Sequence, residues 1–287
     1  MKNKIHFVIP FLQKEVTLKE FLKSNHVGRG KIEEIRVINE ITINNNKATL
    51  DSYIHQGDEI YLVSNEKEVE GYKGPIDILY EDEGIIALNK EEGILVHSDG
   101  NEKDTLLSRI AYYRQNKNEP SIVYPLHRLD KETSGVILFA KDFFHGAIFD
   151  DLFANGKIKR TYEAICKGKL NKDEGELRFY IGKNRHNPEK MIILNKGQLV
   201  ICQYKVLKKT NEYSHLLINI MTGKRHQIRV SFSHINHPLV GDKLYGSPYE
   251  KGPLLLEATF LEFMDPLRQK KVIIKSPLRK EIKNFFR

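Results

Sequence analysis

The sequence predicts an α+β fold, and three of its features lead to that prediction. Short apolar segments separated by polar turns recur along the chain, which is typical of strands. Helical patterns are interspersed among these segments but do not alternate strictly with them, as a doubly wound parallel sheet would require. A polar segment without periodicity, residues 66–75, divides a small N-terminal domain (residues 1–65) from a larger domain (residues 76–287) and is predicted to be a linker.

In the smaller domain, the pattern predicts two helices and two strands. Thr17 is a suitable cap for the first helix. The apolar residues that follow it at helical spacing are Leu18, Phe21 and Leu22. A second helix is expected over residues 32–38, and strands are expected over residues 41–44 and 60–63.

The larger domain contains a series of apolar segments that predict strands. They are short, rich in β-branched and aromatic residues, and separated by polar turns. These segments are residues 85–88, 136–140, 162–166, 199–206 and 215–220. The segment over residues 136–140 is apolar throughout, so we expect it to form a buried strand.

The segment from His127 to Gly135, with the sequence HRLDKETSG, immediately precedes that buried strand. Asp130 is therefore expected to lie in a loop on a rigid support. A carboxylate in such a loop, close to the cationic Arg128, can attack carbon or transfer a proton. Asp, Thr, Ser and Gly also form ordinary turns through side-chain bonds to the backbone, so a short motif of this kind leaves a purely structural role open.

The whole segment points further, because Arg128-Leu129-Asp130 with Thr133-Ser134-Gly135 closely resembles the signature of the RluA-type pseudouridine synthases. Other segments in a set order are similar to the same family, and the resemblance covers about residues 75–287. Residues 78–83 and 85–90 resemble the opening hairpin of the family. The other matching positions are Gly93, His97, residues 159–164, 222–229 and 237–242, and the pair Tyr245-Gly246.

The resemblance implies a fold, a partner and a reaction. The fold is a long, mainly antiparallel sheet with helices on its flanks and an active-site cleft across its middle. The reaction isomerises uridine in folded RNA: the bond between uracil N1 and ribose C1′ breaks, and the base is rejoined through C5. Such an enzyme is expected to extrude the target nucleotide into a pocket. Because many RluA-type enzymes carry an S4-like RNA-binding domain first, residues 1–65 are expected to form one.

The resemblance also assigns roles to individual residues. Asp130 is the essential carboxylate, Tyr162 stacks on the extruded uracil, and Arg229 is expected to form a bidentate pair with Asp130. Arg128 is expected to fill the gap in the base stack or to hold a phosphate. The residues expected to bind substrate or RNA are Arg128, His127, Lys159, Arg160, Lys224, Arg225, His226 and Ile228. The histidines lack metal-ligand spacing, and shaping a loop is the alternative role for each.

Three positions depart from the pattern of the family. Lys90-Glu91-Glu92-Gly93 lacks the usual proline after the lysine, which frees the backbone of that turn. Residues 222–225 read Thr-Gly-Lys-Arg in place of Thr-Gly-Arg-Thr, and Glu257 stands where histidine is common. None of these departures touches the three catalytic candidates, so we expect them to alter substrate preference rather than reaction type.

The chain carries a formal net charge of +8, which favours a polyanionic partner. Large-subunit ribosomal RNA is the first expectation, since family members with this arrangement commonly act there, and transfer RNA is the second. No P-loop or dinucleotide-binding glycine pattern occurs, and Cys166 and Cys202 lack paired spacing, so we expect neither a cofactor nor a metal site. No apolar segment reaches the roughly 20 residues that span a bilayer, and we expect a cytoplasmic monomer.

Two other classes of function stay open at this point. One is a non-catalytic RNA-binding protein with the fold of the enzyme, such as an assembly factor, against which the three intact catalytic candidates argue. The other is a different base-directed enzyme, such as a glycosylase or a deaminase. A deaminase requires zinc ligands and a glutamate at set spacing, and the sequence offers no such set.

Overall fold

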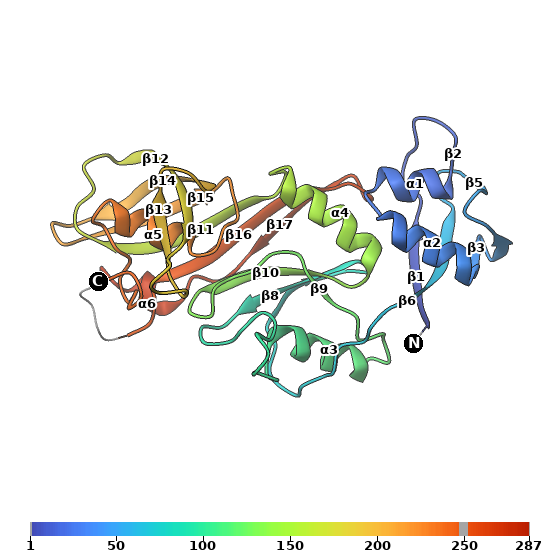
Figure 1. Cartoon of the computed structure of the whole chain (residues 1–287), viewed down its shortest axis with the longest axis horizontal. Coiled ribbons are helices and arrows are strands. Elements are labelled where there is room, and N and C mark those ends of the chain that lie inside the picture. The colour runs from blue at the N-terminus through green and yellow to red at the C-terminus, as the bar shows by residue number, and fades with distance from the viewer. Residues whose placement is uncertain (1, 247–251, 287) are drawn as a thin grey trace.

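The computed structural model of the chain describes residues 2–246 and 252–286. The molecule is elongated, with the N-terminal domain at one end of the long axis and the C-terminus near the other end (Figure 1). Helices and strands of the described residues do not alternate regularly, which confirms the α+β fold. One large sheet runs along the molecule and positions the candidate site.

The large sheet is mainly antiparallel, as the resemblance implied. Its main path in the described residues follows the order β13-β12-β14-β15-β11-β16-β10-β8-β7, with β17 paired to β16 and β9 paired to β10. These strands are β7 (Ile78–Glu81), β8 (Ile85–Lys90), β9 (Tyr124–Pro125), β10 (Ser134–Ala140), β11 (Lys159–Lys167), β12 (Glu174–Lys183), β13 (Met191–Leu194), β14 (Gln198–Lys209), β15 (Tyr213–Ile220), β16 (Leu256–Asp265) and β17 (Lys270–Lys275). Within it, β10 and β16 pair in parallel, through Ser134 with Glu257 and Gly135 with Ala258.

Helices cover the sheet on both faces at its centre. Those of the larger domain are α3 (Leu106–Asn116), α4 (Phe143–Ala154), α5 (Gln227–His234) and α6 (Lys280–Lys283). Successive residues of a strand point to opposite faces. Leu138 of β10 accordingly packs in the cluster that contains Ile148 of α4, and Ile137 packs in the cluster that contains Ile110 of α3. Every residue of β10 is buried, as its apolar sequence predicts.

The N-terminal domain contains the two helices and two strands expected from its sequence. Its elements are β1 (Lys2–Val8), β2 (Val16–Thr17), α1 (Leu18–Ser24), α2 (Arg29–Ile38), β3 (Ile41–Ile43), β4 (Asn46–Ala48), β5 (Tyr53–Ile54) and β6 (Glu59–Asn65). Thr17 caps α1 in a reciprocal capping box with Glu20. The sequence pattern missed β1, which forms the edge of the four-stranded sheet by pairing with β6 about fifty residues later along the chain.

The N-terminal domain packs firmly against α4 of the larger domain. Phe7 of β1 stacks on Phe144 with ring centroids 4.2 Å apart, and both belong to one hydrophobic core. Residues 66–75 contain no helix or strand, yet Glu66 is buried and accepts a 2.6 Å hydrogen bond from Lys31. The two domains are therefore joined by a shared core, and the boundaries drawn from the sequence stay a prediction. No helix in the described ranges is both long enough and apolar enough to cross a bilayer.

Candidate active site

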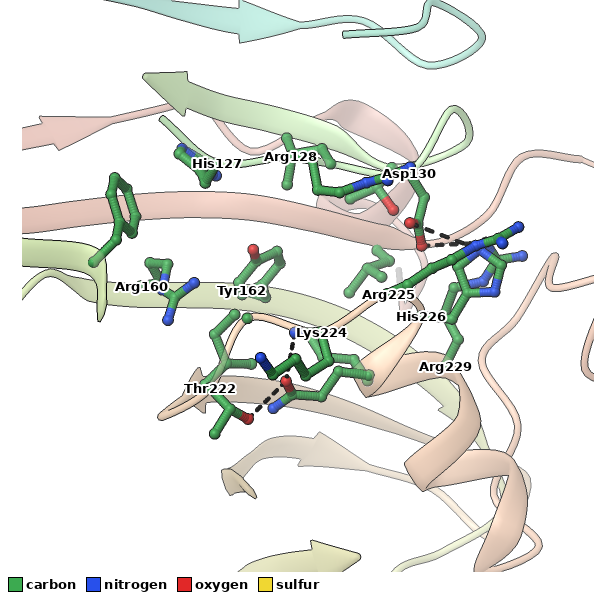
Figure 2. A pocket seen from close by; sticks show the side chains of 18 of the residues that line it. His127, Arg128, Asp130, Arg160, Tyr162, Thr222, Lys224, Arg225, His226 and Arg229 are labelled. Carbon is green, nitrogen blue, oxygen red and sulfur yellow. Dashed lines mark hydrogen bonds and ion pairs between the residues drawn. The ribbon is translucent and has the colours of Figure 1, made fainter. Parts of the chain in front are cut away.

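A cavity of about 400 Å³ lies between the loop before β10, the face of β11 and the segment leading into α5. Figure 2 shows Asp130 and Arg229 at one end of this cavity and Arg160 at the other, with Tyr162 in between. Pockets of this volume hold groups of the size of a small ligand. The structure thus brings the three catalytic candidates, which are far apart in the sequence, to one concave site.

The loop that carries Asp130 is held by its own glycine and threonine. Gly135 has a φ of +109°, and a Cβ atom there would lie 2.1 Å from the carbonyl oxygen of Ala258 on β16. Only glycine fits so close to the neighbouring strand. The amide of Thr133 donates to the carbonyl of Asp130 at 3.0 Å and closes the turn. Asp130, Thr133 and Gly135 therefore belong to one rigid turn.

Lys90, at the end of β8, holds the same loop through a hydrogen bond to its backbone. Its side chain is fully buried, and its ammonium donates to the carbonyls of Glu91 at 2.8 Å and Lys131 at 2.9 Å. Burial lowers the pKa of Lys90 to about 8, although the negative charges of Asp130 and Glu132 oppose the change. The turn that lacks the usual proline is therefore anchored to the Asp130 loop by this buried cation.

Arg229 lies beside Asp130, but its bidentate partner is a different acid. Its Nε and one Nη donate to the two carboxylate oxygens of Asp242, both at 2.9 Å, whereas its other Nη lies 3.4 Å from Asp130 and 3.2 Å from Glu132. The expected bidentate pair with Asp130 is therefore wrong in its geometry. Burial disfavours the charge on Arg229, but the hydrogen bonds to Asp242 and the negative charges of the neighbouring acids together outweigh burial and raise the pKa of the guanidinium above its ordinary value.

His226 also faces Asp130 and is oriented by a tyrosine. The amide of Met191 donates to the Tyr245 hydroxyl oxygen at 2.8 Å, which leaves the hydroxyl proton for Nδ1 of His226 at 2.9 Å. We therefore assign the His226 proton to Nε2, which lies 3.7 Å from Asp130. Burial lowers the pKa of His226 and favours the neutral ring. The site thus directs two N–H groups, one charged and one neutral, at Asp130.

Tyr162 forms the central wall of the cavity. It lies on β11, is 6% exposed, and packs with Ala164 and Cys166 from the same face of the strand. Burial raises the pKa of Tyr162 to about 12, so the phenol stays protonated near neutral pH. Its hydroxyl has no hydrogen-bond partner among residues 2–246 and 252–286. The cavity is also lined by Ile228, whose apolar side chain adds a second surface to the ring of Tyr162. These two apolar surfaces suit a flat base.

A family model described as RNA pseudouridylate synthase matches residues 84–234, the part of the chain that contains this cavity. The chain belongs to the RNA pseudouridylate synthase family. The synthase is 32% identical over 262 residues to YhcT, an uncharacterized RNA pseudouridine synthase of Bacillus subtilis, in an alignment covering 89% of this chain and 85% of that protein. It is 31% identical over 246 residues to ribosomal large subunit pseudouridine synthase D of Pseudomonas aeruginosa, covering 78% of this chain and 76% of the relative.

The fold of the synthase also occurs among solved structures. Human RNA pseudouridylate synthase domain containing 1 superimposes with a TM-score of 0.61 at 21% identity, covering 74% of this chain and 86% of that chain. These similarities confirm the pseudouridine synthase fold, the RluA-type resemblance and the enzyme class predicted from the motifs. The synthase is an isomerase that acts on uridine in RNA.

The remaining candidates for RNA contact in the synthase are either exposed to solvent or hydrogen-bonded within the protein. Arg128, Lys159 and Lys224 are exposed to solvent, and Arg128 and Lys224 line the cavity whereas Lys159 does not. His127 is engaged instead: its Nε2 accepts the amide of Leu138 at 3.1 Å, and burial lowers its pKa to about 3. A neutral ring bonded to β10 shapes the loop, which was the alternative role considered for it, while the ring also lines the cavity.

Arg225 and Glu257 show how two departures from the family pattern are accommodated. Arg225 lies next to the cavity and donates to the carbonyl of Glu189 at 3.1 Å, so it ties the segment before α5 to the loop before β13. Glu257 is buried, accepts the backbone amide of Arg279 at 2.9 Å, and has a raised pKa because of burial. Glu92, from the altered turn, pairs with the Arg279 side chain at 2.9 Å. These acids are held by the C-terminal segment and do not line the cavity.

Three residues that shape the site of the synthase carry no assigned role in the sequence pattern: Asp242, Tyr245 and Lys90. Asp242 and Tyr245 lie in segments that resemble the family, but a motif does not say which residue its side chains meet. A physical signal did exist for Asp242. Buried arginines are mostly paired with an acid, and Asp242 is the acid within the segment of the motif that follows Arg229.

Proposed function

We propose that the synthase converts specific uridines to pseudouridine in structured RNA with Asp130 as the essential carboxylate, and that large-subunit ribosomal RNA is its substrate. One observation supports the catalytic role most strongly: Asp130 lies in the cavity with N–H groups of Arg229 and His226 directed at its two oxygens, at 3.4 and 3.7 Å. A carboxylate held in this way keeps a fixed direction inside a small cavity.

The proposed reaction conserves all atoms of the nucleotide. The bond between uracil N1 and ribose C1′ breaks, a bond between C1′ and C5 forms, and the C5 proton leaves while N1 gains one. Asp130 is the group placed to act on the ribose, either by bonding to the sugar or by removing a ribose proton. No external energy source or redox partner is needed, which agrees with the expectation that the synthase works without a cofactor.

Tyr162 and Ile228 are proposed to hold the extruded uracil between them. Tyr162 offers a flat ring with a protonated hydroxyl, and Ile228 offers an apolar surface from α5. Because the base must turn before it is rejoined, such a pair lets it rotate in its plane without losing its stacking partner. The hydroxyl of Tyr162 has no partner in the described protein and is free to take part in proton transfer.

The exposed cations around the cavity are proposed to hold the RNA backbone. Arg128 stands at the rim beside Asp130 and is placed to fill the gap left in the base stack (Figure 2). Lys224 is exposed and lines the cavity, so it suits a phosphate contact there, whereas Lys159 is exposed outside the cavity and suits a contact with RNA beyond it. His226 and Arg225 act from the α5 side, the first on Asp130 and the second on the loop before β13.

Large-subunit ribosomal RNA is the proposed substrate because relatives named ribosomal large subunit pseudouridine synthase D align with most of this chain. Transfer RNA is the second candidate. We further propose that the synthase acts as a monomer in the cytoplasm.

The N-terminal domain (residues 1–65) is proposed to be an S4-like RNA-binding domain joined by residues 66–75 to the catalytic domain (residues 76–287). Several of its cations are already paired, as Lys31 is with Glu66. Lys14, Lys23 and Arg29 are exposed and form the proposed RNA-facing set. Deleting the domain would expose Phe144, so we propose reversing these three charges to glutamate instead.

The charge-reversal variant should bind ribosomal RNA fragments more weakly while keeping its folded structure. Reversal of three exposed C-terminal lysines, at Lys270, Lys275 and Lys280, is the matched control, because it changes the net charge by the same amount and none of these lysines lines the cavity. Equal affinities of the two triple variants would remove the RNA-binding role from the N-terminal domain.

The proposed substrate is tested by mapping pseudouridines in cells that lack the protein. We expect one or a few positions of large-subunit ribosomal RNA to revert to uridine and to be restored by the wild-type gene but not by an Asp130→Asn gene. Loss of pseudouridine in transfer RNA alone would transfer the assignment to the second candidate. An unchanged pseudouridine map in both RNA classes, with normal expression, would support a non-catalytic assembly factor.

A further inference from the structure

We propose that Arg160 forms a buried phosphate-binding subsite at the end of the cavity opposite Asp130, and that it receives a backbone phosphate of a nucleotide that neighbours the extruded uridine in the RNA chain. This inference rests on the proposed function, because it names the group that a cavity made for RNA holds at that end. It differs from general contact by surface lysines in that the guanidinium of Arg160 is buried.

Arg160 is a buried cation without an ionic partner. It is 7% exposed, and its Nε is buried without a hydrogen-bond partner. Within residues 2–246 and 252–286, no carboxylate lies within ion-pair distance of the guanidinium. The ring centroid of Phe153 lies 5.5 Å from the guanidinium carbon. An uncompensated charge in such a place is costly in the free protein, which is unusual unless a ligand supplies the opposite charge.

The other buried arginines of the synthase show what Arg160 lacks. Arg229 has Asp242, and Arg114, which is 6% exposed, donates to Glu119 at 3.2 Å and to the carbonyl of Lys141 at 2.7 Å. Burial lowers the pKa of Arg160, and among the described residues no carboxylate counteracts that effect. An arginine remains protonated under such conditions, because its ordinary pKa is above 12. The missing partner is therefore an anion.

The guanidinium of Arg160 faces the cavity rather than the protein core. Side chains two residues apart on a strand point to the same face, so Arg160 and Tyr162 both point into the cavity, whereas Lys159 points to the other side. Figure 2 shows Arg160 and Tyr162 following one another along β11. A phosphate at Arg160 would thus lie beyond a base stacked on Tyr162, on the side away from Asp130.

Gly223 leaves room for this arrangement. A Cβ atom at position 223 would lie 2.5 Å from an Nη atom of Arg160, so any side chain there would push the guanidinium aside. Thr222 and Lys224, on either side of the glycine, also line the cavity. The exposed ammonium of Lys224 adds a second positive charge at the same end. This end of the cavity is therefore cationic, in contrast to the end that contains Asp130.

Phosphate is the anion that fits these observations. The phosphodiester is the negatively charged group that every RNA carries at each nucleotide, and the planar guanidinium of arginine matches it in a bidentate geometry. A uracil carbonyl is the alternative acceptor, but it is neutral and would leave the buried charge uncompensated. The two ligands predict different dependence of binding on salt.

The first experiment measures RNA affinity against salt concentration. Full-length Asp130→Asn protein and the same protein with Arg160→Met or Arg160→Lys are titrated with a labelled single-stranded RNA that contains uridines. We expect Arg160→Met to weaken binding on the order of tenfold and to reduce the slope of log affinity against log salt by about 0.7, the value for one phosphate on a single strand. Arg160→Lys, which keeps the charge, should retain most of that slope.

The second experiment measures the stability of the free protein. Arg160→Met should leave the urea midpoint unchanged or raise it, because it removes a buried charge that has no partner. Arg114→Met is the matched control and should lower the midpoint clearly, because it removes the hydrogen bonds that Arg114 donates to Glu119 and to two backbone carbonyls. This comparison needs neither RNA nor turnover.

Two results would overturn the subsite. If Arg160→Met weakened RNA binding without changing the salt slope, the guanidinium would contact a neutral group instead of a phosphate. If Arg160→Met destabilised the free protein as much as Arg114→Met, the charge would already be compensated within the fold. Pseudouridine formation by the wild-type protein is measured in parallel, so failure of this inference and failure of the proposed function give separate readouts.

Discussion

Arg229 makes two hydrogen bonds of 2.9 Å to Asp242, while its approach to Asp130 is a single contact of 3.4 Å. The arginine is thus fixed by a fully buried acid and presents its remaining Nη to the carboxylate of Asp130. Glu132, whose side chain is half exposed, shares that Nη at 3.2 Å. The orientation of the group that faces Asp130 therefore depends on Asp242 more than on Asp130 itself.

Asp242→Asn is expected to lower both stability and turnover. It breaks the buried pair and leaves the charge of Arg229 without its main partner, a change that costs about 3 kcal/mol or more in other buried pairs. Arg229 is then free to turn fully toward Asp130 and Glu132 and to lose its fixed direction. Urea unfolding and single-turnover rates measure the two effects. A variant of normal stability and normal rate would contradict the positioning role of Asp242.

Glu132→Gln is the matched comparison, because it removes the other acid that contacts Arg229. The side chain of Glu132 is half exposed, so its loss should change the free energy of unfolding by less than about 1 kcal/mol. Arg229 would keep its hydrogen bonds to Asp242, and its remaining Nη would contact the carboxylate of Asp130 alone. We expect turnover at or above the wild-type rate. A large loss of turnover in this variant would mean that Glu132 itself takes part in the reaction.

Tyr245→Phe is expected to slow the reaction without weakening RNA binding. The change removes the hydroxyl that fixes the tautomer of His226, so Nε2–H is no longer held toward Asp130. We expect kcat to fall roughly tenfold, the effect of about one misdirected hydrogen bond. Tyr180→Phe, at a tyrosine that is 46% exposed, is the control and should have no effect. Equal loss of RNA affinity and of kcat in Tyr245→Phe would indicate a general distortion of the fold.

Lys90 should make stability depend on pH above neutrality. Its pKa is about 8 in the folded protein against 10.5 for the ordinary side chain, so between these values the unfolded chain holds a proton that the folded chain has lost. This group therefore makes the protein more stable as pH rises from about 8 to about 10.5, by about 3 kcal/mol in total. Below pH 8 both states are protonated and the contribution is constant.

The measurement compares wild type, Lys90→Met and Lys131→Met by urea unfolding from pH 7 to pH 10. The difference in stability between wild type and Lys90→Met should grow with pH in the direction that favours wild type. Lys131, whose side chain is 47% exposed, is the control at the same loop and should show no such trend. A difference that stays constant with pH would mean that Lys90 keeps its proton throughout.

The ring and the hydroxyl of Tyr162 are expected to contribute differently to the reaction rate. Tyr162→Phe keeps the stacking surface and removes only the hydroxyl, whereas Tyr162→Ala removes both and opens a cavity next to Ile218 in the core. Single-turnover rates should fall modestly in the first variant and by a further hundredfold or so in the second, since loss of the ring misplaces the base. Equal rates in the two variants would assign the whole effect to the hydroxyl.

Much of the fold could be predicted from the sequence because its elements have strong local patterns. The helix after Thr17 and the apolar strand that became β10 both appear where they were expected. β1 was missed because its stability comes from pairing with β6, which is distant in the sequence. α4 was also missed: it is apolar nearly all round, since one side faces the sheet and another faces Phe7, and such a helix lacks the one-sided pattern that identifies surface helices.

The candidate site could be predicted in its residues but not in its contacts. The motifs assigned Asp130, Tyr162 and Arg229 to one site, and all three residues line the same cavity. A motif states spacing, however, and the partner of Arg229 depends on how α5 lies against the segment that contains Asp242. Arg160 appeared in the sequence as one of several clustered cations. The two-residue period of a strand already separates it from Lys159, so its position in the cavity with Tyr162 was available from the sequence.

The central claim is that Asp130 performs the isomerisation, and its most direct test is tritium release from RNA labelled at uracil C5. Wild-type protein should release the label as C5 loses its proton, without forming free uracil. Asp130→Asn should fold and bind RNA normally but lower the release by at least roughly a thousandfold, as expected when a covalent or proton-transfer group is removed. Release by Asp130→Asn at the wild-type rate would contradict the account.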